Sequence, residues 1–369
     1  MNVGIIGTGA IAWKHAQAYK NIGYRVAAST NTTAERGRKF AVATGAAFVP
    51  SVEELCGRAD IDFIDVCTFP GYRLRAVELA AENRKHVLVQ KPMAVDLETA
   101  ARMITIARHA GIQLGVISQH RFDDSVLFLK RAIAAGRLGR MLQADAYVKW
   151  HRTAEYYARP VKGSWAVEGG GALITQAIHQ VDLLLHLAGA AEEVFGYWQL
   201  GGTHAIESED AVCAVLRYAS GATGVIQAST SVWPGYPERV EIHGTRGTAI
   251  ITGDQLTAWD VQGDEGDDAP VVRSGAASGA SDPMAISLLP FERQLSDFGE
   301  ACKTSRTPAC SGVDGYHALE LVRSIYESCA EGRKIELAPK EFELGATASL
   351  DISGSFTDSG RAQGSNDER

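Results

Sequence analysis

The chain has 369 residues, of which 46% are hydrophobic and 22% are charged, and its formal net charge is −8. This length exceeds the usual size of a single hydrophobic core and predicts two domains, and the composition is ordinary for a globular protein. The acidic balance argues against a nucleic-acid partner, and no apolar run is long enough to span a membrane.

The first twelve residues read as a short apolar strand that runs into G-x-G-x-x-A. Gly7 permits a tight turn, Gly9 leaves out the Cβ that would meet a phosphate, and Ala12 lets the next helix lie close to the strand. The N–H groups at the start of that helix, at Ala10 and Ile11, would face the anion. The sequence therefore predicts a dinucleotide-binding turn.

Residues 1–118 alternate short apolar runs with runs of helical spacing. We expect strands at residues 3–6, 25–29, 47–49, 63–67, 86–90 and 113–116, and helices at residues 11–19, 74–83 and 97–110. Such alternation predicts a parallel sheet with helices on both faces. Residues 1–120 are therefore expected to form a dinucleotide-binding Rossmann domain of the α/β class.

After about residue 120 the pattern changes to helices and closely spaced strands. Helical spacing covers residues 125–135, 168–187, 291–303 and 316–331, and strand-like runs cover residues 141–150, 194–200, 211–218, 223–231, 239–243, 248–251 and 255–259. They predict an α+β domain at residues 121–340 with a large open, mainly antiparallel sheet. A second subunit is expected to cover the open face, which favours a homodimer or homotetramer. Residues 262–283 read as a loop and residues 341–369 as a disordered tail.

The segment Val89-Gln90-Lys91-Pro92-Met93 closes a predicted strand, at the edge of the sheet that faces a ligand crevice. Pro92 restrains the backbone of Lys91. Burial in a crevice can lower the pKa of a lysine, so that it exchanges a proton near neutral pH. The alternative is a solvated surface lysine.

Residues 168–182 combine three glycines with a predicted helix. The glycines leave a loop that can pass close to a substrate or to nicotinamide. The helix carries Thr175, His179 and Asp182 at positions i, i+4 and i+7, on one face. His179 is a proton carrier by its ordinary pKa, and the alternative is a histidine packed in the core.

The order G-x-G-x-x-A, Lys-Pro and G-G-G…His-x-x-Asp resembles the glucose–fructose oxidoreductase, inositol dehydrogenase and rhizopine-catabolism (Gfo/Idh/MocA) family over about residues 2–336. The resemblance implies that Lys91 and His179 flank the substrate carbinol beside the nicotinamide. There they would take the alcohol proton and stabilise the oxyanion, while NAD or NADP supplies the hydride chemistry. The nearest resemblance is to members that act as sugar or glycoside 3-dehydrogenases.

Three positions depart from the family pattern. Gln90 stands where the family has an acid before Lys-Pro, Thr175 where it often has aspartate, and Arg73 where a histidine is common. A threonine does not ionise near pH 7, so the resemblance leaves the proton transfer to Lys91 and His179, with Thr175 as a positioning group.

The end of the second predicted strand bears on the choice of cofactor. It reads Ala28-Ser29-Thr30-Asn31-Thr32-Thr33 and offers no acid to bind the ribose, whereas Arg36 and Arg38 follow closely. The sequence therefore slightly favours NADP, and NAD stays open. Cofactor contacts are expected from Gly7, Gly9, Ala10, Ile11, Ala12, Thr30, Asn31, Arg36, Thr68, Gln90 and Lys91.

The substrate site is expected to present aromatic faces and hydrogen-bonding groups, which suit a polyhydroxylated ring. The candidates are Arg121, Lys149, Trp150, His151, Arg152, Tyr156, Tyr157, Trp165, Gln176 and His179. We expect reversible oxidation of a secondary ring hydroxyl on a sugar, glycoside, sugar derivative or cyclic polyol, without a metal. A dihydrodiol-type dehydrogenase and a catalytically silent dinucleotide-binding regulator are the alternatives. The six cysteines form no Cys-x-x-Cys pair and no charged leader precedes the first strand, which favours a cytoplasmic protein.

Overall fold

The computed structural model describes residues 1–159, 161–263, 269–271 and 287–337. Most of the predicted loop at 262–283, and the whole predicted tail at 341–369, lie outside the described residues. Within the described ranges, no helix has the length and hydropathy that crossing a membrane requires.

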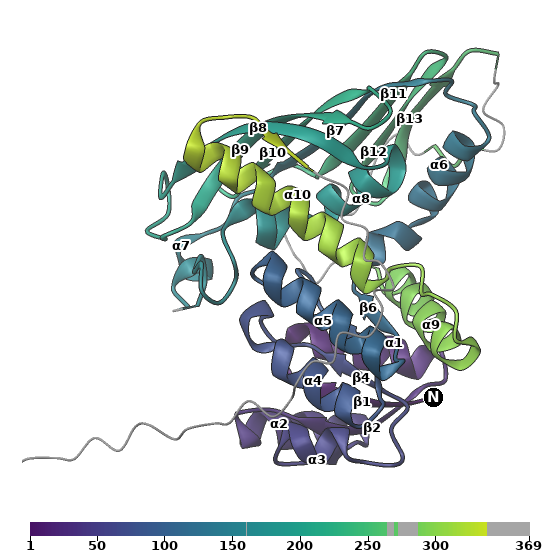
Figure 1. Ribbon diagram of the computed structural model, residues 1–369, viewed down its shortest axis with the longest axis vertical. Helices are drawn as coiled ribbons and strands as arrows, with labels where there is room; N and C mark the ends of the chain where they lie inside the picture. The colour runs from purple at the N-terminus through teal and green to yellow at the C-terminus, as the bar shows by residue number, and fades with distance from the viewer. Residues whose placement is uncertain (160, 264–268, 272–286, 338–369) are drawn as a thin grey trace, which may run out of the picture. The chain divides into compact units, whose positions relative to one another are not determined.

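The first part of the chain forms a six-stranded parallel sheet in the order β3-β2-β1-β4-β5-β6 (Figure 1). Its strands are β1 (Asn2–Ile6), β2 (Arg25–Thr30), β3 (Ala47–Phe48), β4 (Phe63–Val66), β5 (His86–Val89) and β6 (Leu114–Val116). The strand order reverses between β1 and β4, and ligands bind at the carboxyl ends of strands where such a reversal occurs. The predicted Rossmann fold is confirmed.

Helices cover both faces of this parallel sheet. They are α1 (Ala10–Asn21), α2 (Ala34–Thr44), α3 (Val52–Cys56), α4 (Leu74–Glu82) and α5 (Leu97–Ala110), with a short 3₁₀ turn, η1 (Pro70–Tyr72), before α4. The late helix α9 (Leu289–Thr304) also packs here, and Leu295 and Phe298 join Ile5 and Phe63 in one buried core. Burying each such side chain contributes about 1.5–3 kcal/mol, so a distant segment of the chain helps to hold the first sheet together.

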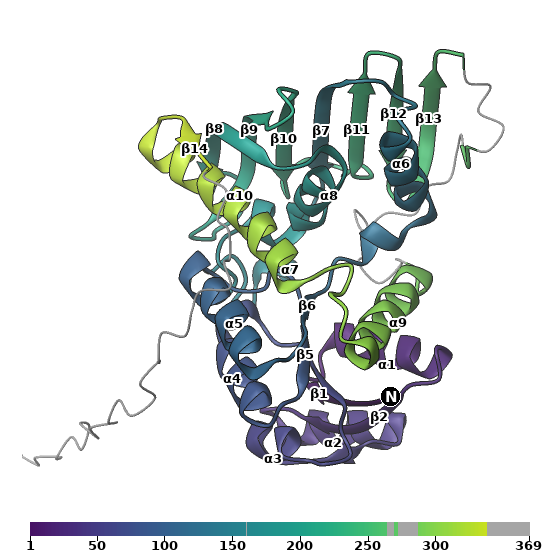
Figure 2. The same ribbon diagram turned by 45° about the vertical axis from the view of Figure 1, so that its right-hand side comes forward.

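The second sheet has eight strands in the order β13-β12-β11-β7-β10-β9-β8-β14 (Figure 2). Its strands are β7 (Met141–Lys149), β8 (Ala191–Leu200), β9 (Glu209–Tyr218), β10 (Thr223–Ser229), β11 (Arg239–Gly244), β12 (Gly247–Thr252), β13 (Gln255–Val261) and β14 (Ile335–Glu336). All neighbours are antiparallel except β10 and β7, which are parallel. The predicted mainly antiparallel sheet is confirmed, although no strand was predicted at β14.

One face of the second sheet carries the helices α6 (Asp124–Ala134), α8 (Ile178–Ala188) and α10 (Gly312–Glu331), which contact β13, β7 and β8 respectively. Among the helices of the described residues, none is seen on the other face (Figure 2). Along β9, Ala214 and Leu216 are buried, whereas Cys213, Val215 and Arg217 between and beside them are exposed. This two-residue alternation is typical of an antiparallel sheet with one covered face.

The predicted helix at residues 168–187 differs from the observed one. It begins with a π segment, η3 (Leu173–Ala177), and continues as α8. Thr175 lies in the wider π turn, while His179 and Asp182 lie in the regular helix. A π turn contains more residues than an α turn, so the predicted alignment of Thr175 with His179 and Asp182 on one face stays a prediction.

Candidate active site

The turn after β1 has the geometry of an anion cradle. Gly7 has a φ of +87°, and a Cβ there would lie 3.1 Å from the carbonyl oxygen of Cys67, so only glycine fits without strain. Gly9 is the N-cap of α1 and has no side chain to cap the N–H groups of the helix. The space that a Cβ on Gly9 would occupy is open. Ala12 is fully buried against the sheet. The first N–H groups of α1, at Ala10 and Ile11, are therefore available to a phosphate.

Two buried hydroxyl groups beside this cradle fit a dinucleotide. The Oγ1 atoms of Thr8 and Thr68 are buried and have no hydrogen-bond partner among the described residues. Buried hydroxyl groups are normally paired, so both are suited to ligand oxygens. The sequence analysis named Thr68 but missed Thr8, which occupies the variable position of the G-x-G motif.

The end of β2 carries Thr30 and Asn31, which were predicted to contact the adenosine ribose. The carbonyl of Thr30 accepts a hydrogen bond from the N–H of Gly7 at 2.9 Å, and Oδ1 of Asn31 accepts one from the N–H of Thr8 at 3.2 Å. Both residues therefore brace the glycine turn. Arg36 is exposed near the start of α2, and the guanidinium of Arg38 lies 5.5 Å from the ring centre of Phe48.

Lys91 follows β5 and is partly buried. Its Nζ donates a hydrogen bond to the backbone carbonyl of Thr175 at 2.8 Å. Burial, and then the positive charges of Lys162 and Arg73, lower the pKa of Lys91 to about 7, although Glu168 opposes them. Because this pKa is near neutral pH, the amine can both accept and release a proton there.

His179 lines the same small cavity as Lys91. The imidazole is 8% exposed, and burial, the charge of Lys91 and the nearby His120 hold its pKa well below 6.5. His179 is therefore a neutral ring at pH 7 that can form hydrogen bonds to a substrate hydroxyl. The structure thus brings together the two residues, 88 positions apart, to which the sequence analysis gave the proton transfer.

His120 is a neighbour of His179 that sequence reasoning missed. It lies in the 3₁₀ turn η2 (Gln119–Phe122), and the two rings meet edge to face with centroids 5.0 Å apart. Nδ1 of His120 lies 2.7 Å from a carboxylate oxygen of Asp123. Burial alone would lower the pKa of His120, but the charge and hydrogen bond of Asp123 raise it overall. The only sequence signal was its place beside the family-like Arg121-Phe122.

Hydrogen bonds join the side chains of Arg152, Tyr156 and Gln176 near Lys91. Nε2 of Gln176 donates to the hydroxyl of Tyr156 at 2.8 Å, and Nη2 of Arg152 donates to Oε1 of Gln176 at 3.2 Å. The ammonium of Lys162, which the sequence analysis missed, lies 4.9 Å from the ring centre of Tyr156 and is paired with Glu168. An aromatic face beside hydrogen-bonding groups is the arrangement expected for binding a sugar ring.

Comparison with known proteins identifies the family. A model described as "Oxidoreductase family, NAD-binding Rossmann fold" matches residues 1–118, and one described as "GFO/IDH/MocA C-terminal domain" matches residues 126–250. The chain belongs to the Gfo/Idh/MocA family. It is therefore an oxidoreductase with an NAD-binding Rossmann half, as its sequence predicted.

Full-length relatives of this Gfo/Idh/MocA protein are known. The chain is 29% identical over 342 residues to 1,5-anhydro-D-fructose reductase of Ensifer adhaerens, with 90% of this chain and 98% of the relative covered. It is 28% identical over 351 residues to myo-inositol 2-dehydrogenase of Thermotoga maritima, with 91% and 98% covered. The WlbA dehydrogenase from Bordetella pertussis, solved in complex with NADH and UDP-GlcNAcA, has a TM-score of 0.81 and 28% identity, with 92% and 99% covered.

The glycine loop of this family member is shaped by the protein around it. A Cβ on Gly171 would lie 1.8 Å from the carbonyl oxygen of Glu209, which no side chain tolerates. The carboxylate of Glu209 accepts hydrogen bonds from the N–H groups of Gly171 and Leu173 and from the hydroxyl of Tyr326, at 2.7–2.8 Å. The glycine loop packs against β9 and α10, and this packing alone requires glycine at position 171. A close approach of the loop to the substrate is not needed to explain it. Sequence reasoning missed Glu209 because β9 is distant in the chain.

Other predicted substrate residues are engaged elsewhere in the protein. The guanidinium of Arg121 forms two hydrogen bonds to the carboxylate of Asp182, at 2.6 and 2.7 Å, and one to Asp314 at 3.0 Å. These groups join η2 to α8 and α10, so the donors of Arg121 are used within the chain. Lys149 is exposed at the end of β7, and Nε1 of Trp165 donates to the carbonyl of Glu207.

Three more residues were predicted to contact the substrate, namely Trp150, His151 and Tyr157, and each has a partner within the chain. Nε1 of Trp150 donates to Glu238, the ring of His151 meets that of Trp233, and the hydroxyl of Tyr157 is bonded to Thr230. The ring of Tyr157 packs edge to face on that of Tyr156, and the guanidinium of Arg152 lies 4.7 Å from the ring centre of Trp150. The contact of these candidates with substrate stays a prediction.

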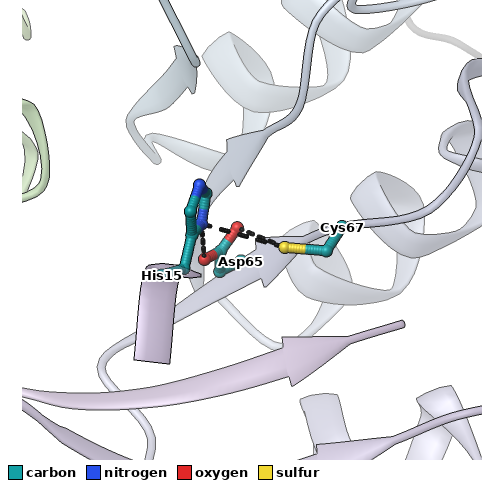
Figure 3. Close-up of side chains that lie close together, drawn as sticks. All are labelled: His15, Asp65 and Cys67. Atoms are coloured by element: carbon teal, nitrogen blue, oxygen red, sulfur yellow. Dashed lines mark hydrogen bonds and ion pairs between the residues drawn. The ribbon is translucent and has the colours of Figure 1, made fainter. Parts of the chain in front are cut away.

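The side chain of Gln90 joins a buried network beneath the cofactor turn. Its Nε2 lies 2.9 Å from Nε2 of His15, whose Nδ1 lies 2.6 Å from a carboxylate oxygen of Asp65. Figure 3 shows His15 and Asp65 with Cys67, whose thiol donates a hydrogen bond to the carboxylate of Asp65 at 3.4 Å. The hydroxyl of Tyr19 also donates to this carboxylate, at 2.9 Å. These residue types also bind metals. However, the hydrogen bonds alone account for their arrangement, which ties α1 to β4 and to the residue before Lys91.

Proposed function

We propose that this protein catalyses the reversible NAD(P)-dependent oxidation of a secondary ring hydroxyl on a sugar, glycoside, sugar derivative or cyclic polyol. The observation that carries the proposal is that Lys91 and His179, 88 positions apart, lie close enough for the charge of Lys91 to act on His179, and burial lowers the pKa of both. Both groups can therefore be neutral near pH 7 and accept a hydrogen bond or a proton from an alcohol. The names of the relatives, which include an anhydrofructose reductase and an inositol dehydrogenase, support a ring polyol as the substrate class.

The two residues divide the proton chemistry. The pKa of Lys91 is about 7, whereas the pKa of His179 lies well below 6.5, so Lys91 is the better acceptor of the alcohol proton. His179 orients the hydroxyl by a hydrogen bond. In the reverse reaction the ammonium of Lys91 returns the proton to the oxyanion. The nicotinamide, once bound with its phosphates at the start of α1, would supply the hydride acceptor.

The direct test is an assay of cofactor reduction. The protein is incubated with NAD or NADP and a panel of sugars, glycosides, inositols and a ring dihydrodiol, and absorbance of the reduced nicotinamide is followed. We expect turnover with at least one sugar or cyclic polyol. Turnover of the dihydrodiol alone would favour the dihydrodiol-type dehydrogenase. Cofactor binding without turnover of any compound would favour a silent regulator.

The preference between NAD and NADP is a separate part of the proposal. The carboxyl end of β2 carries Thr30 and Asn31, with no acidic side chain that would repel a 2′-phosphate, and Arg36 is exposed nearby. These features support a slight preference for NADP. The NADH bound to WlbA shows that NAD serves a related dehydrogenase, so both cofactors belong in the assay.

We also propose a homo-oligomer that forms through the open face of the second sheet. On neighbouring strands, Phe195 of β8 pairs with Val215 of β9, and Val215 with Val225 of β10, which places an apolar row across this face. Val215 is 55% exposed and Tyr197 is 68% exposed. A second copy would remove this apolar surface from water. Sedimentation analysis of the wild type and of Val215→Lys should give an oligomer and a smaller species respectively.

Two further expectations belong to this proposal. The division into domains at residues 1–120 and 121–340 is supported by the two separate sheets, but α9 packs in the core of the first sheet. Limited proteolysis of the whole chain therefore tests the division better than expression of each part alone. The cytoplasmic location rests on the sequence, and fractionation of the source cells would test it.

A further inference from the structure

Arg73 joins the two turns at the carboxyl ends of β4 and β5. It follows η1 and is only 2% exposed. Nε and Nη2 donate to the backbone carbonyl of Thr68 at 3.0 and 2.6 Å, and Nη1 donates to the carbonyls of Gln90 and Pro92. One side chain therefore holds three carbonyl groups, from the turn with the predicted cofactor contact Thr68 and the turn that carries Lys91.

This guanidinium is buried without a paired carboxylate. In the ranges that the structure describes, Arg73 forms no ion pair, and Asp65 acts on it only through space. Burial lowers the pKa of Arg73 to about 9, so it remains protonated at pH 7. Burying a charge that has no opposite charge beside it is costly. The three carbonyl groups offset only part of this cost, which argues that the arrangement has a use.

We propose that Arg73 is a positioning residue that fixes the Lys91–Pro92 dipeptide by binding the carbonyl group on each side of it. The inference rests on the function proposed above, because it concerns how Lys91 is presented to the substrate. The backbone of Lys91 is held by Arg73, and its Nζ is held by the carbonyl of Thr175. A lysine whose backbone and Nζ are both held by hydrogen bonds keeps its amine in one position in the crevice. Such preorganisation supports proton transfer.

The chemistry of the guanidinium suits this task. It has five N–H donors in a planar fork, whereas the imidazole common at this position in the family has at most two and an ammonium has no fixed fork. The charge of Arg73 has a second effect. The groups that act on the pKa of Lys91 are Lys162, Arg73 and Arg152, which lower it, and Glu168, which raises it. Loss of Arg73 should therefore raise the pKa of Lys91.

Two substitutions separate position from charge. Arg73→Met removes both the donors and the charge, and Arg73→Lys keeps the charge but loses the fork. For each, the pH dependence of labelling of Lys91 by an amine-reactive reagent is measured on the cofactor-free protein by mass spectrometry. We expect the midpoint to move to higher pH by at least about half a unit in Arg73→Met and to move less in Arg73→Lys.

Steady-state kinetics then test the positional effect. We expect both variants to lower kcat about 100-fold, because small misplacements of a reacting group have effects of that size. KM for the sugar should change less than about threefold, whereas the dissociation constant of NADH should rise, because Arg73 also holds the carbonyl of Thr68. Arg75→Met is the matched control, because Arg75 lies two positions later, is 59% exposed and pairs with Glu78 and Glu82. Its kcat and labelling midpoint should equal those of the wild type.

The outcomes distinguish this inference from the proposed function. If the wild type turns over a sugar but folded Arg73→Lys keeps its full kcat, the fork is not needed and the positioning role is wrong. If the wild type turns over no compound, the proposed function is wrong. The labelling experiment still tests Arg73 in that case, and an unchanged midpoint in Arg73→Met would overturn the inference. Thermal unfolding identifies any variant that fails to fold, and Arg73→Lys, which changes least, then decides the question.

Discussion

Nζ of Lys91 donates a hydrogen bond to the backbone carbonyl of Thr175 at 2.8 Å, across 84 positions of the chain. The contact joins the turn after β5 to the π segment that precedes α8. The carbonyl group receives this hydrogen bond, while the hydroxyl of Thr175 donates to the carbonyl of Gly171. The contact therefore does not depend on the side chain at position 175.

Substitution of these two residues should have unequal effects. We expect Lys91→Ala to lower kcat about 100- to 10,000-fold, the usual effect of removing a proton-transfer group. Thr175→Ala should lower kcat less than about tenfold, because it leaves the carbonyl in place. Initial rates of nicotinamide reduction measure both effects, and fluorescence titration with NADH should give similar affinities. Equal losses of kcat would show that the hydroxyl of Thr175 takes part in proton transfer.

The pH dependence should report the state of Lys91. Burial and then the charge of Lys162 lower the pKa of Lys91 to about 7. Oxidation needs the neutral amine, so kcat/KM for oxidation should rise as pH increases through about 7 and level off above it. The reductive direction needs the ammonium and should show the opposite trend. These profiles are measured with saturating cofactor, and a midpoint near 10 would contradict the assignment.

Lys162 provides a test of the cause of this pKa. Lys162→Met removes a positive charge that lowers the pKa of Lys91, so the rise in kcat/KM should move to higher pH. Lys303→Met is the matched control, because Lys303 lies in α9, is about half exposed and pairs with Glu300. Its profile should match that of the wild type. The same profile in both variants would mean that Lys162 does not act on Lys91.

His179 should affect the rate without setting the midpoint. Its pKa is held well below 6.5 by burial and then by Lys91, so the ring is already neutral when Lys91 titrates. We expect His179→Asn to lower kcat about 100-fold while the midpoint of kcat/KM stays near 7. The measurement is a pH series of initial rates. If the midpoint disappears in this variant, His179 and not Lys91 is the titrating base.

The sequence contains the information for the local elements but not for the contacts between distant ones. Alternation of apolar and helical runs predicted the six strands of the first sheet. The resemblance to the Gfo/Idh/MocA family implied the convergence of Lys91 and His179. The role of Glu209 depends on β9 passing beside the glycine loop, and no local pattern records that contact. Arg121 was expected at the substrate, yet its partner Asp182 lies 61 positions later. A pattern identifies a residue that can bind, and tertiary structure decides what it binds.

The cofactor preference should depend on Arg36. If this exposed side chain near the start of α2 binds the 2′-phosphate of NADP, Arg36→Ala should lower kcat/KM for NADP about tenfold and leave kcat/KM for NAD unchanged. Arg25→Ala is the control, because Arg25 is exposed at the amino end of β2. The two cofactors are compared side by side in both variants. A strong preference for NAD that persists in Arg36→Ala would end the assignment of NADP.

Arg121 should matter for stability more than for substrate binding. Its guanidinium is 7% exposed, forms two hydrogen bonds to Asp182, and also pairs with Asp314. Breaking a buried pair by removing one partner leaves an uncompensated charge and costs about 3–5 kcal/mol. We expect urea unfolding of Arg121→Ala to show a loss of this size.

The matched control for Arg121 is Arg75→Ala. Arg75 pairs with Glu78 and Glu82 at an exposed site, where an ion pair contributes only about 0–1 kcal/mol. If Arg121 instead contacted the substrate, Arg121→Ala would raise KM while the free energy of unfolding stayed near that of the wild type. Measuring both quantities in both variants therefore decides between a structural role in joining η2 to α8 and a direct role in recognising the sugar.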